Sequence, residues 1–379
     1  MSKIYEIDPD ADTLVIVRPL QEDFAPWPVD EKKKTATQQT NGHVNGHSLT
    51  NGASPAEVRI KVSSKHLSLA SPHFRDRFAW RLAGRSGGYN GGKHGNDEDA
   101  VHADGRVHVV LDGLDAAAVI AVFNIVHGRG GRDRVPKAVD LEALARIAVV
   151  VDRFRLQDAV ELYAERWIDD LYRRRGVTSP SSTAGRAAGS QQRDLALWIY
   201  VAYVFQRADI FREATKVAAT QSTGPLPALP NLPLRAKIVH DVDAQRQAVI
   251  AQALDLLQAA VDQLVAASDE SEDARGGGVT NTSDTNTDAF LLGTLLRTLH
   301  RNRLFWPRPN APYVGVSVAA ITRAAHEVQT QVWRLAARVG DTTRSNRTNN
   351  KLLLTPQLDT LRASIAGLDL TSELGYPLY

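Results

Sequence analysis

The chain has 379 residues, of which 43% are apolar and 23% are charged, with 45 basic and 43 acidic side chains and no cysteine. At roughly 100–200 residues per domain, this length predicts two or three folded units. The ordinary globular composition excludes collagen-like and wholly disordered chains, and the lack of cysteine excludes disulfides, thiolate zinc sites and thiol nucleophiles. A net charge of +2 gives no reason to expect nucleic acid or an anionic membrane as a partner.

The N-terminal segment and the apolar runs bear on location. Residues 1–12 are too acidic and too weakly apolar for a secretory signal. No stretch reaches the roughly 18 apolar residues that a membrane span needs. We therefore expect a soluble intracellular protein without a membrane partner, and its cytoplasmic or nuclear location stays open.

Five polar tracts interrupt the better-patterned parts of the chain. They cannot bury enough apolar surface to offset the entropy of ordering, so we predict low-complexity insertions, a linker and loops there. The tracts are 28–56, 84–105, 173–192, 268–288 and 341–350.

Three short strands are predicted in the first third of the chain. Residues 14–17 are a continuous apolar run, which is typical of a buried strand. Residues 58–62 alternate apolar with charged side chains, as in a half-buried strand. Residues 107–111 alternate with His108 and Val110, which indicates a strand partly covered on both faces.

Helix signals are clear in the same region. Ser71 before Pro72 predicts an N-cap with proline at the first helical position, in a helix with Phe74 and Phe78 on its inner face. Two further helices are predicted to begin after caps, and a fourth covers 157–172. The predicted caps are Asp115 and Asp140.

The second half predicts only helices. Residues 195–205 form an apolar helix, a proline-punctuated turn covers 225–233, and a long amphipathic helix covers 234–267. Two more helices cover 288–302 and 317–338. The predicted fold class is therefore α+β, a small sheet with packed helices followed by an all-α domain.

Two segments resemble catalytic or phosphate-binding motifs, but each lacks a residue or a neighbouring element that the chemistry requires. Residues 87–93 match the phosphate-loop pattern G-x-x-x-x-G-K, but His94 replaces the magnesium-binding hydroxyl and no strand precedes the loop. His326 and Glu327 begin like a zinc-protease helix, but Thr330 stands where the second ligand belongs. We therefore expect no enzyme activity, no cofactor, no metal and no small-molecule substrate.

Two weaker sets keep an enzyme as a rival hypothesis. The first is a group of serines and histidines near a predicted helix start, namely Ser63, Ser64, Ser71, His66 and His73. Helix capping explains these serines more simply than catalysis does. The second is a group of acids beside apolar segments, namely Asp112, Asp152 and Asp241. Capping and solvation explain these acids better than a paired carboxylate site does.

The order and spacing of the elements resemble the BTB (POZ) fold, in particular the BTB proteins of filamentous fungi. The matching segments are DTLVIV at 12–17, VSSKHL at 62–67, ASPHF at 70–74, VHVVL at 107–111, FNIVHG at 123–128 and IAVVVDRF within 141–167. WIYV at 198–201 and LFWP at 304–307 resemble the helical extension of these fungal proteins. The resemblance implies a protein-interaction module without active site or cofactor, which self-associates or serves as an adaptor.

Three departures from the family narrow this expectation. Ser63 and Ser64 replace the His-Lys pair that lines a charged pocket in transcription-repressor members, although Asp12 of that pocket is present. The hydrophobic-x-Glu signature for cullin contact has no clear match in 84–105. About eleven residues precede the first predicted strand, too few for the swapped strand of the long dimerising form, while simpler self-association stays open.

We predict a BTB-like domain over 8–172 and a helical domain over 193–379. The predicted function is a non-enzymatic protein–protein interaction module that acts as a self-associating scaffold. The alternatives are a substrate adaptor for a cullin-type ubiquitin ligase and a transcription cofactor. The predicted partners are other proteins, either a second copy of the chain or a cullin. The predicted interaction surface contains Leu14, Ile16, Phe74 and Phe78, which the competing interpretation places in the core.

Overall fold

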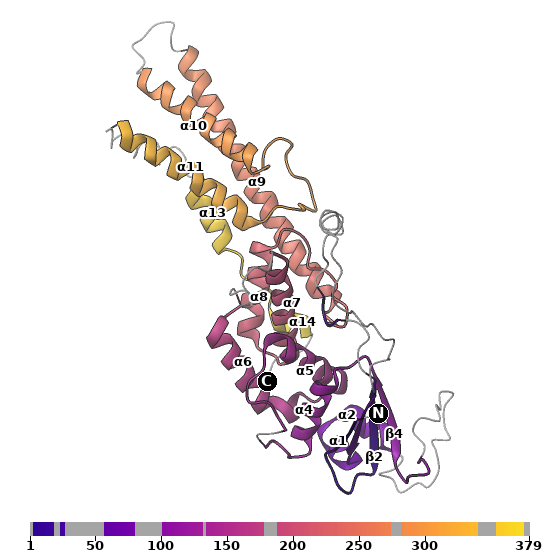
Figure 1. Ribbon diagram of the computed structural model, residues 1–379. Helices are drawn as coiled ribbons and strands as arrows, with labels where there is room; N and C mark the ends of the chain where they lie inside the picture. The colour runs from indigo at the N-terminus through magenta and orange to yellow at the C-terminus, as the bar shows by residue number, and fades with distance from the viewer. Residues whose placement is uncertain are drawn as a thin grey trace, which may run out of the picture. The chain divides into compact units, whose positions relative to one another are not determined.

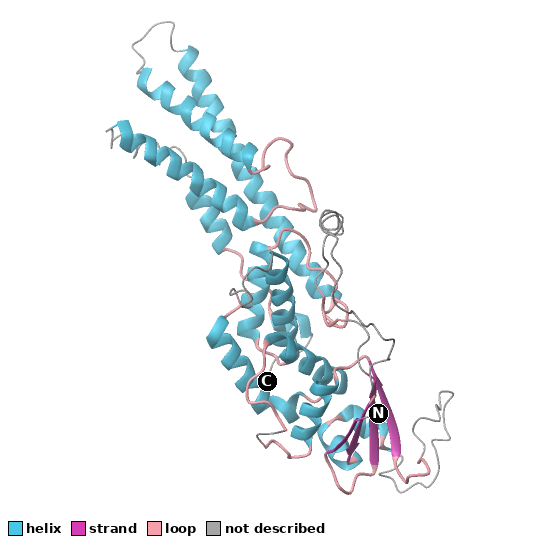
Figure 2. Cartoon of the chain, in the orientation of Figure 1, coloured by secondary structure: helices cyan, strands magenta, loops and turns pink. Residues whose placement is uncertain are grey.

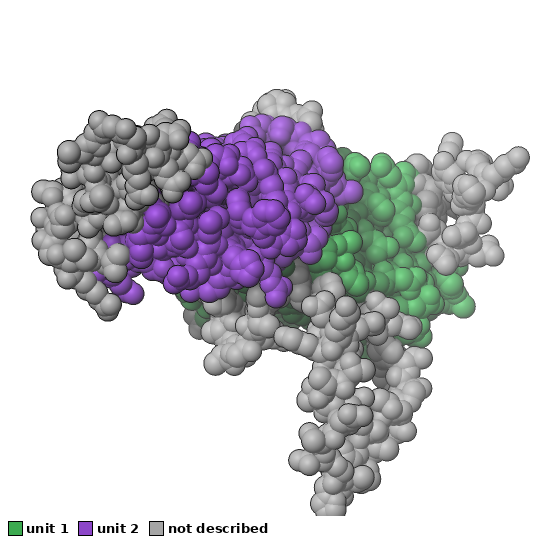
Figure 3. Space-filling view, turned by 90° about the horizontal axis from the view of Figure 1, so that it is seen from above, with its two compact units in different colours: residues 1–211, 227–234, 378–379 green, residues 212–226, 235–377 purple. Residues whose placement is uncertain are grey.

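The structure is a computed structural model in which the chain forms two compact units (Figure 3). The first unit contains residues 1–211, 227–234 and 378–379, and the second contains 212–226 and 235–377. The structure describes residues 3–18, 23–26, 57–79, 101–131, 134–177, 188–273, 282–339 and 354–374.

Four strands form one sheet in the first unit (Figure 2). They are β1 (Lys3–Glu6), β2 (Thr13–Arg18), β3 (Val58–Val62) and β4 (Val107–Asp112). The order is β1-β3-β2-β4, so β2 lies between the antiparallel β3 and the parallel β4. The three predicted strands are confirmed. β1 has no predicted counterpart, because its residues are mostly exposed and carry no apolar alternation.

The helices of the first unit begin where local sequence signals place them. They are α1 (Ser64–Ala70), α2 (Pro72–Arg77), α4 (Ala116–Val126), α5 (Leu141–Phe154), α6 (Gln157–Arg175) and α7 (Ala188–Val204), as labelled in Figure 1. The predicted caps are confirmed: Ser71, Asp115 and Asp140 each accept a hydrogen bond from the N–H three residues on. The mixed α+β class is therefore observed.

The first unit extends beyond the predicted domain boundary. α6 continues to Arg175, and α7 begins at Ala188, so both helices enter the predicted linker 173–192. α7 then packs against α5. Because of this packing, the predicted boundary falls inside the first unit, which continues to Phe211.

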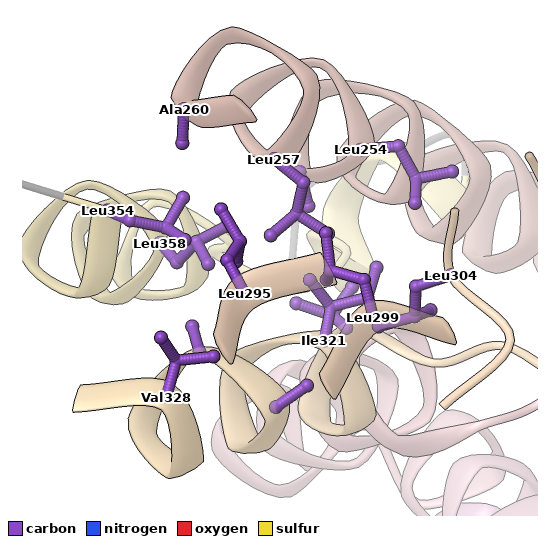
Figure 4. Close-up of a cluster of buried hydrophobic side chains, with 14 of the residues drawn as sticks. Leu254, Leu257, Ala260, Leu295, Leu299, Leu304, Ile321, Val328, Leu354 and Leu358 are labelled. Carbon is purple, nitrogen blue, oxygen red and sulfur yellow. The ribbon is translucent and has the colours of Figure 1, made fainter. Parts of the chain in front are cut away.

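The described elements of the second unit are all helices, joined by loops. The unit begins within α8 (Ala208–Gln221), of which it contains the part from Arg212 on. The helices that follow are α9 (Ala236–Asp273), α10 (Thr282–Arg301), α11 (Val318–Val339), α13 (Leu354–Ala363) and α14 (Leu370–Leu374). α9 packs against α10, α11 and α13. Their facing apolar side chains form the core shown in Figure 4, which includes Leu254, Leu257, Leu295, Leu299, Ile321 and Leu358.

Several predicted loops differ from the structure. α8 occupies residues between the predicted helix 195–205 and the proline-punctuated turn, because Ile210, Phe211 and Ala214 form a buried stripe at helical spacing. α9 and α10 both reach into the predicted loop 268–288. In the predicted insertion 84–105, residues 101–105 form a turn that leads into β4, where Val101 bridges to Val107.

The other predicted insertions and loops lie outside the residues that the structure describes. The rest of 84–105, including the phosphate-loop match and the cullin-signature region, lies outside the described residues. The predicted insertion 28–56 and the predicted loop 341–350 also lie outside them.

One described helix, α9, is long and apolar enough over Ala236–Ala266 to cross a membrane by length and composition. Core helices of proteins that do not enter membranes pass the same test. α9 places Leu254 and Leu257 in the core of the second unit, and its buried Arg246 pairs with Asp243. The helix is therefore weak evidence for a membrane span.

Candidate interaction surfaces

Two of the four residues expected at an interaction surface lie inside the first unit. Phe74 and Phe78 are fully buried, and their ring centroids lie 6.0 Å apart. The Phe74 ring also stacks on Phe154 at 4.8 Å. These two residues therefore belong to an aromatic core, and a partner would reach them only if the helices separated.

The other two expected residues, Leu14 and Ile16, share one face of β2. Side chains alternate along a strand, so both point away from the face of Val15 and Val17, which are fully buried. Leu14 is itself buried, whereas Ile16 is partly exposed. β2 is flanked by β3 and β4 and has no free edge. Ile16 is thus the member of the predicted set that a partner can contact directly.

A hydrogen-bonded corner joins β2 to the start of α1. Asp12 Oδ1 accepts the Ser64 N–H at 2.7 Å, and Oδ2 accepts the Ser64 hydroxyl at 2.6 Å. The Ser63 N–H donates to Nε2 of His127 at 3.0 Å. Because Nε2 accepts, Nδ1 carries the proton and donates to the Phe123 carbonyl oxygen at 2.7 Å. His127 is therefore neutral, and burial lowers its pKa from the ordinary value.

Two of the serine hydroxyls considered as nucleophiles, those of Ser64 and Ser71, donate to oxygen atoms and not to a histidine. A serine nucleophile must donate its hydroxyl proton to a base. Ser64 donates instead to a carboxylate, and Ser71 donates to a backbone carbonyl of α5 at 2.5 Å. Ser71 also caps α2, as predicted, whereas Ser63 makes no side-chain cap. The capping interpretation thus holds for Ser71, and Ser64 ties the corner together.

The three aspartates considered as catalytic acids have separate partners. Asp112 pairs with an arginine of β2 at 3.4 Å, and Asp152 accepts from the Tyr200 hydroxyl at 3.2 Å. Burial, together with this carboxylate, raises the pKa of Tyr200 above its usual range. In the second unit, Lys237 donates to Asp241 at 2.8 Å and lowers the pKa of that carboxyl. None of the three is thus hydrogen-bonded to another of them.

A groove of about 140 Å³ lies along α6 in the first unit. Asp158, Glu161 and Glu165 follow one another at spacings of three and four residues, which places them on one helix face. Ala164 and Ile168 supply apolar lining. Arg207 also lines the groove, where it pairs with Asp169 and Asp209, so the lining carries both signs of charge.

A second groove, of about 460 Å³, lies beside the end of β4 and the C-terminal part of α5. Its apolar lining includes Leu114, Val149, Leu232 and Pro233. The Arg153 guanidinium, which also lines the groove, donates to the backbone carbonyl of Asp112, the last residue of β4, at 2.8 Å. The groove offers an apolar side chain of another protein a partly enclosed place.

No family model matches the chain, and no curated protein or solved structure matches it. Within the described ranges, no group of three or more histidine, aspartate or glutamate side chains is arranged to hold a metal ion. The function is therefore inferred from the residues of this chain.

Proposed function

We propose that the first unit is a BTB-like protein-interaction module without catalytic function. The observation that carries this proposal is the order of its elements. β2, β3, α2, β4, α4, α5 and α6 occur in the order of the three strands and four helices of the resemblance, with β1 before them and α1 between β3 and α2.

Self-association is the first property to test. Leu69 on α1 is 80% exposed, so a charge there would disturb a contact with a partner without disturbing the core. α1 packs against α2, the helix that carries the expected interface residues. Leu162 on α6 is 79% exposed and provides a matched control.

Light scattering on the full chain over a range of concentrations provides the measurement. We expect a dimer or larger species at micromolar concentration, a shift toward monomer for Leu69→Arg, and no shift for Leu162→Arg. A monomer at every concentration contradicts the self-associating scaffold.

The adaptor and cofactor alternatives need different experiments. A pull-down with the purified cullin tests the adaptor, and no binding at micromolar concentration contradicts it. Nuclear exclusion of a tagged chain contradicts the transcription cofactor.

A further inference from the structure

Residues 302–317 form the loop between α10 and α11 (Figure 1). We call it the Trp306 loop. A buried arginine of α9, Arg246, holds this loop by hydrogen bonds. Arg246 is 1% exposed, and its Nε donates to Asp243 at 2.8 Å. Its two terminal nitrogens donate to three loop carbonyls, those of Pro312 at 2.6 Å, Tyr313 at 3.3 Å and Val316 at 3.4 Å. Three hydrogen bonds from one side chain thus fix the second half of the loop, and a fourth holds the guanidinium against Asp243 of its own helix.

Both ends of the Trp306 loop are also anchored in the second unit. Leu304 and Val316 are buried in the hydrophobic core, and Phe305 and Tyr313 pack against it. The Gly315 N–H donates to a backbone carbonyl outside the loop at 2.7 Å. The backbone that carries the remaining side chains is therefore held in one conformation by its contacts.

The anchored loop presents large apolar side chains to solvent. Trp306 and Val314 are each 74% exposed. Tryptophan is among the residues that contribute most when they become buried at an interface. Since the loop is already ordered by its own anchors, a partner that covers Trp306 loses less conformational entropy on binding.

The sequence that contains the loop carries basic charges and no acidic ones. From Ala289 to His326 the sequence contains no aspartate or glutamate, although it contains several arginines. Arg303 is exposed and forms no ion pair within the described part of the chain. Arg308 pairs with Asp255, but both side chains are exposed, and such pairs are weak enough to exchange for an acidic group of a partner.

We propose that the Trp306 loop docks an acidic segment of a partner protein, with an apolar side chain of that segment against Trp306. Charge complementarity with Arg303 and Arg308 selects the acidic partner. Single-stranded nucleic acid would favour several stacking rings and free cations, whereas the loop presents one strongly exposed ring and one of these two cations is paired. The proposal does not rest on the function proposed for the first unit, so either can fail alone.

Fluorescence anisotropy with labelled probes and the full chain tests the proposal. The main probe is a short synthetic peptide with leucine and phenylalanine among aspartates and glutamates. The comparison probes are the same peptide with lysine in place of the acids and a short oligo-dT strand. We expect saturable micromolar binding of the acidic peptide alone, with an affinity that falls as salt is raised.

Two variants and two matched controls locate the binding. Trp306→Ala should lower the affinity for the acidic peptide about thirtyfold. Arg303→Glu should lower this affinity about tenfold. Phe290→Ala on α10 and Arg362→Glu on α13, both exposed in the same unit, should leave the affinity unchanged. The proposal is overturned if the acidic peptide does not bind, if Trp306→Ala binds it as well as the natural chain does, or if oligo-dT binds equally well.

Discussion

Replacing Arg246 with methionine should destabilise the second unit more than the loss of a surface ion pair does. The guanidinium pairs with Asp243 and donates to three carbonyls of the Trp306 loop. Methionine fills the space of the aliphatic stem but donates to none of these oxygens. A buried polar group left without a partner costs roughly 1–3 kcal/mol. Gln247 still donates to Asp243 at 2.6 Å, so that carboxylate keeps one partner.

The expected loss for Arg246→Met is about 3 kcal/mol, the lower end of the range for breaking a buried ion pair, because Gln247 remains. At about 2–4 °C per kcal/mol for a unit of this size, the Tm should fall by about 6–12 °C. Arg246→Lys should lose less, because it keeps the charge beside Asp243 but not the planar fork.

Urea and heat denaturation followed by circular dichroism provide the measurement. Arg308→Met is the matched control, because its ion pair with Asp255 lies at the surface and contributes less than about 1 kcal/mol. If Arg246→Met costs no more than Arg308→Met, the account of the buried guanidinium is wrong.

Three further outcomes are expected. The free energy of unfolding should fall as the pH drops below about 6.5, because burial lowers the folded-state pKa of His127 and the unfolded chain takes up the proton first. In urea titrations at several pH values, His127→Gln should make this fall shallower. An unchanged dependence on pH would contradict this role of His127. Gly367→Ala should cost about 2 kcal/mol in thermal denaturation, since its φ is +80° and the new Cβ would lie 2.2 Å from the Arg212 carbonyl oxygen. Gly293→Ala, in open space on α10, should instead stabilise by about 0.5–1 kcal/mol, and equal effects at the two glycines would contradict this reasoning. Asp140→Ala should cost about 1 kcal/mol by removing the cap of α5, whereas Asp140→Asn should cost little.

Features that depend on a few neighbouring residues were predictable from the sequence. The caps at Ser71, Asp115 and Asp140 each need only the next turn of the chain, so their signals are complete locally. The three central strands were predictable for the same reason, because an apolar run or alternation identifies a strand before its partner is known.

Neither β1 nor α8 was predicted from the sequence. β1 is mostly exposed and is held by backbone pairing with β3, where Lys3 lies opposite Val58, so no side-chain pattern marks it. α8 does carry a readable stripe, with Ile210, Phe211 and Ala214 buried. No helix was predicted for these residues, which lie between the predicted helix 195–205 and the proline-punctuated turn 225–233.

The place of Phe74 and Phe78 could not be decided from the sequence. A core and an interface both bury aromatic rings, and the same spacing on a helix serves either. Phe74 packs on Phe154, which belongs to a helix 80 residues later in the chain, and Phe78 stacks on Phe74. Only the tertiary structure joins those segments.

For Arg246, the sequence predicts burial of the side chain but not the groups that accept its hydrogen bonds. It lies four residues after Val242 and four before Ile250, so it occupies the buried stripe of α9. A charge on such a stripe must find hydrogen-bond acceptors, which makes an acceptor-rich neighbour predictable in principle. The neighbour itself is not predictable, because the acceptors are backbone carbonyls 66 to 70 residues away, and carbonyls have no signature in a sequence. The acid-free stretch around Trp306 is visible in the sequence, but its use as a surface depends on a fixed loop backbone. That backbone is fixed by Arg246, so the candidate surface of the second unit follows from the structure and not from the pattern alone.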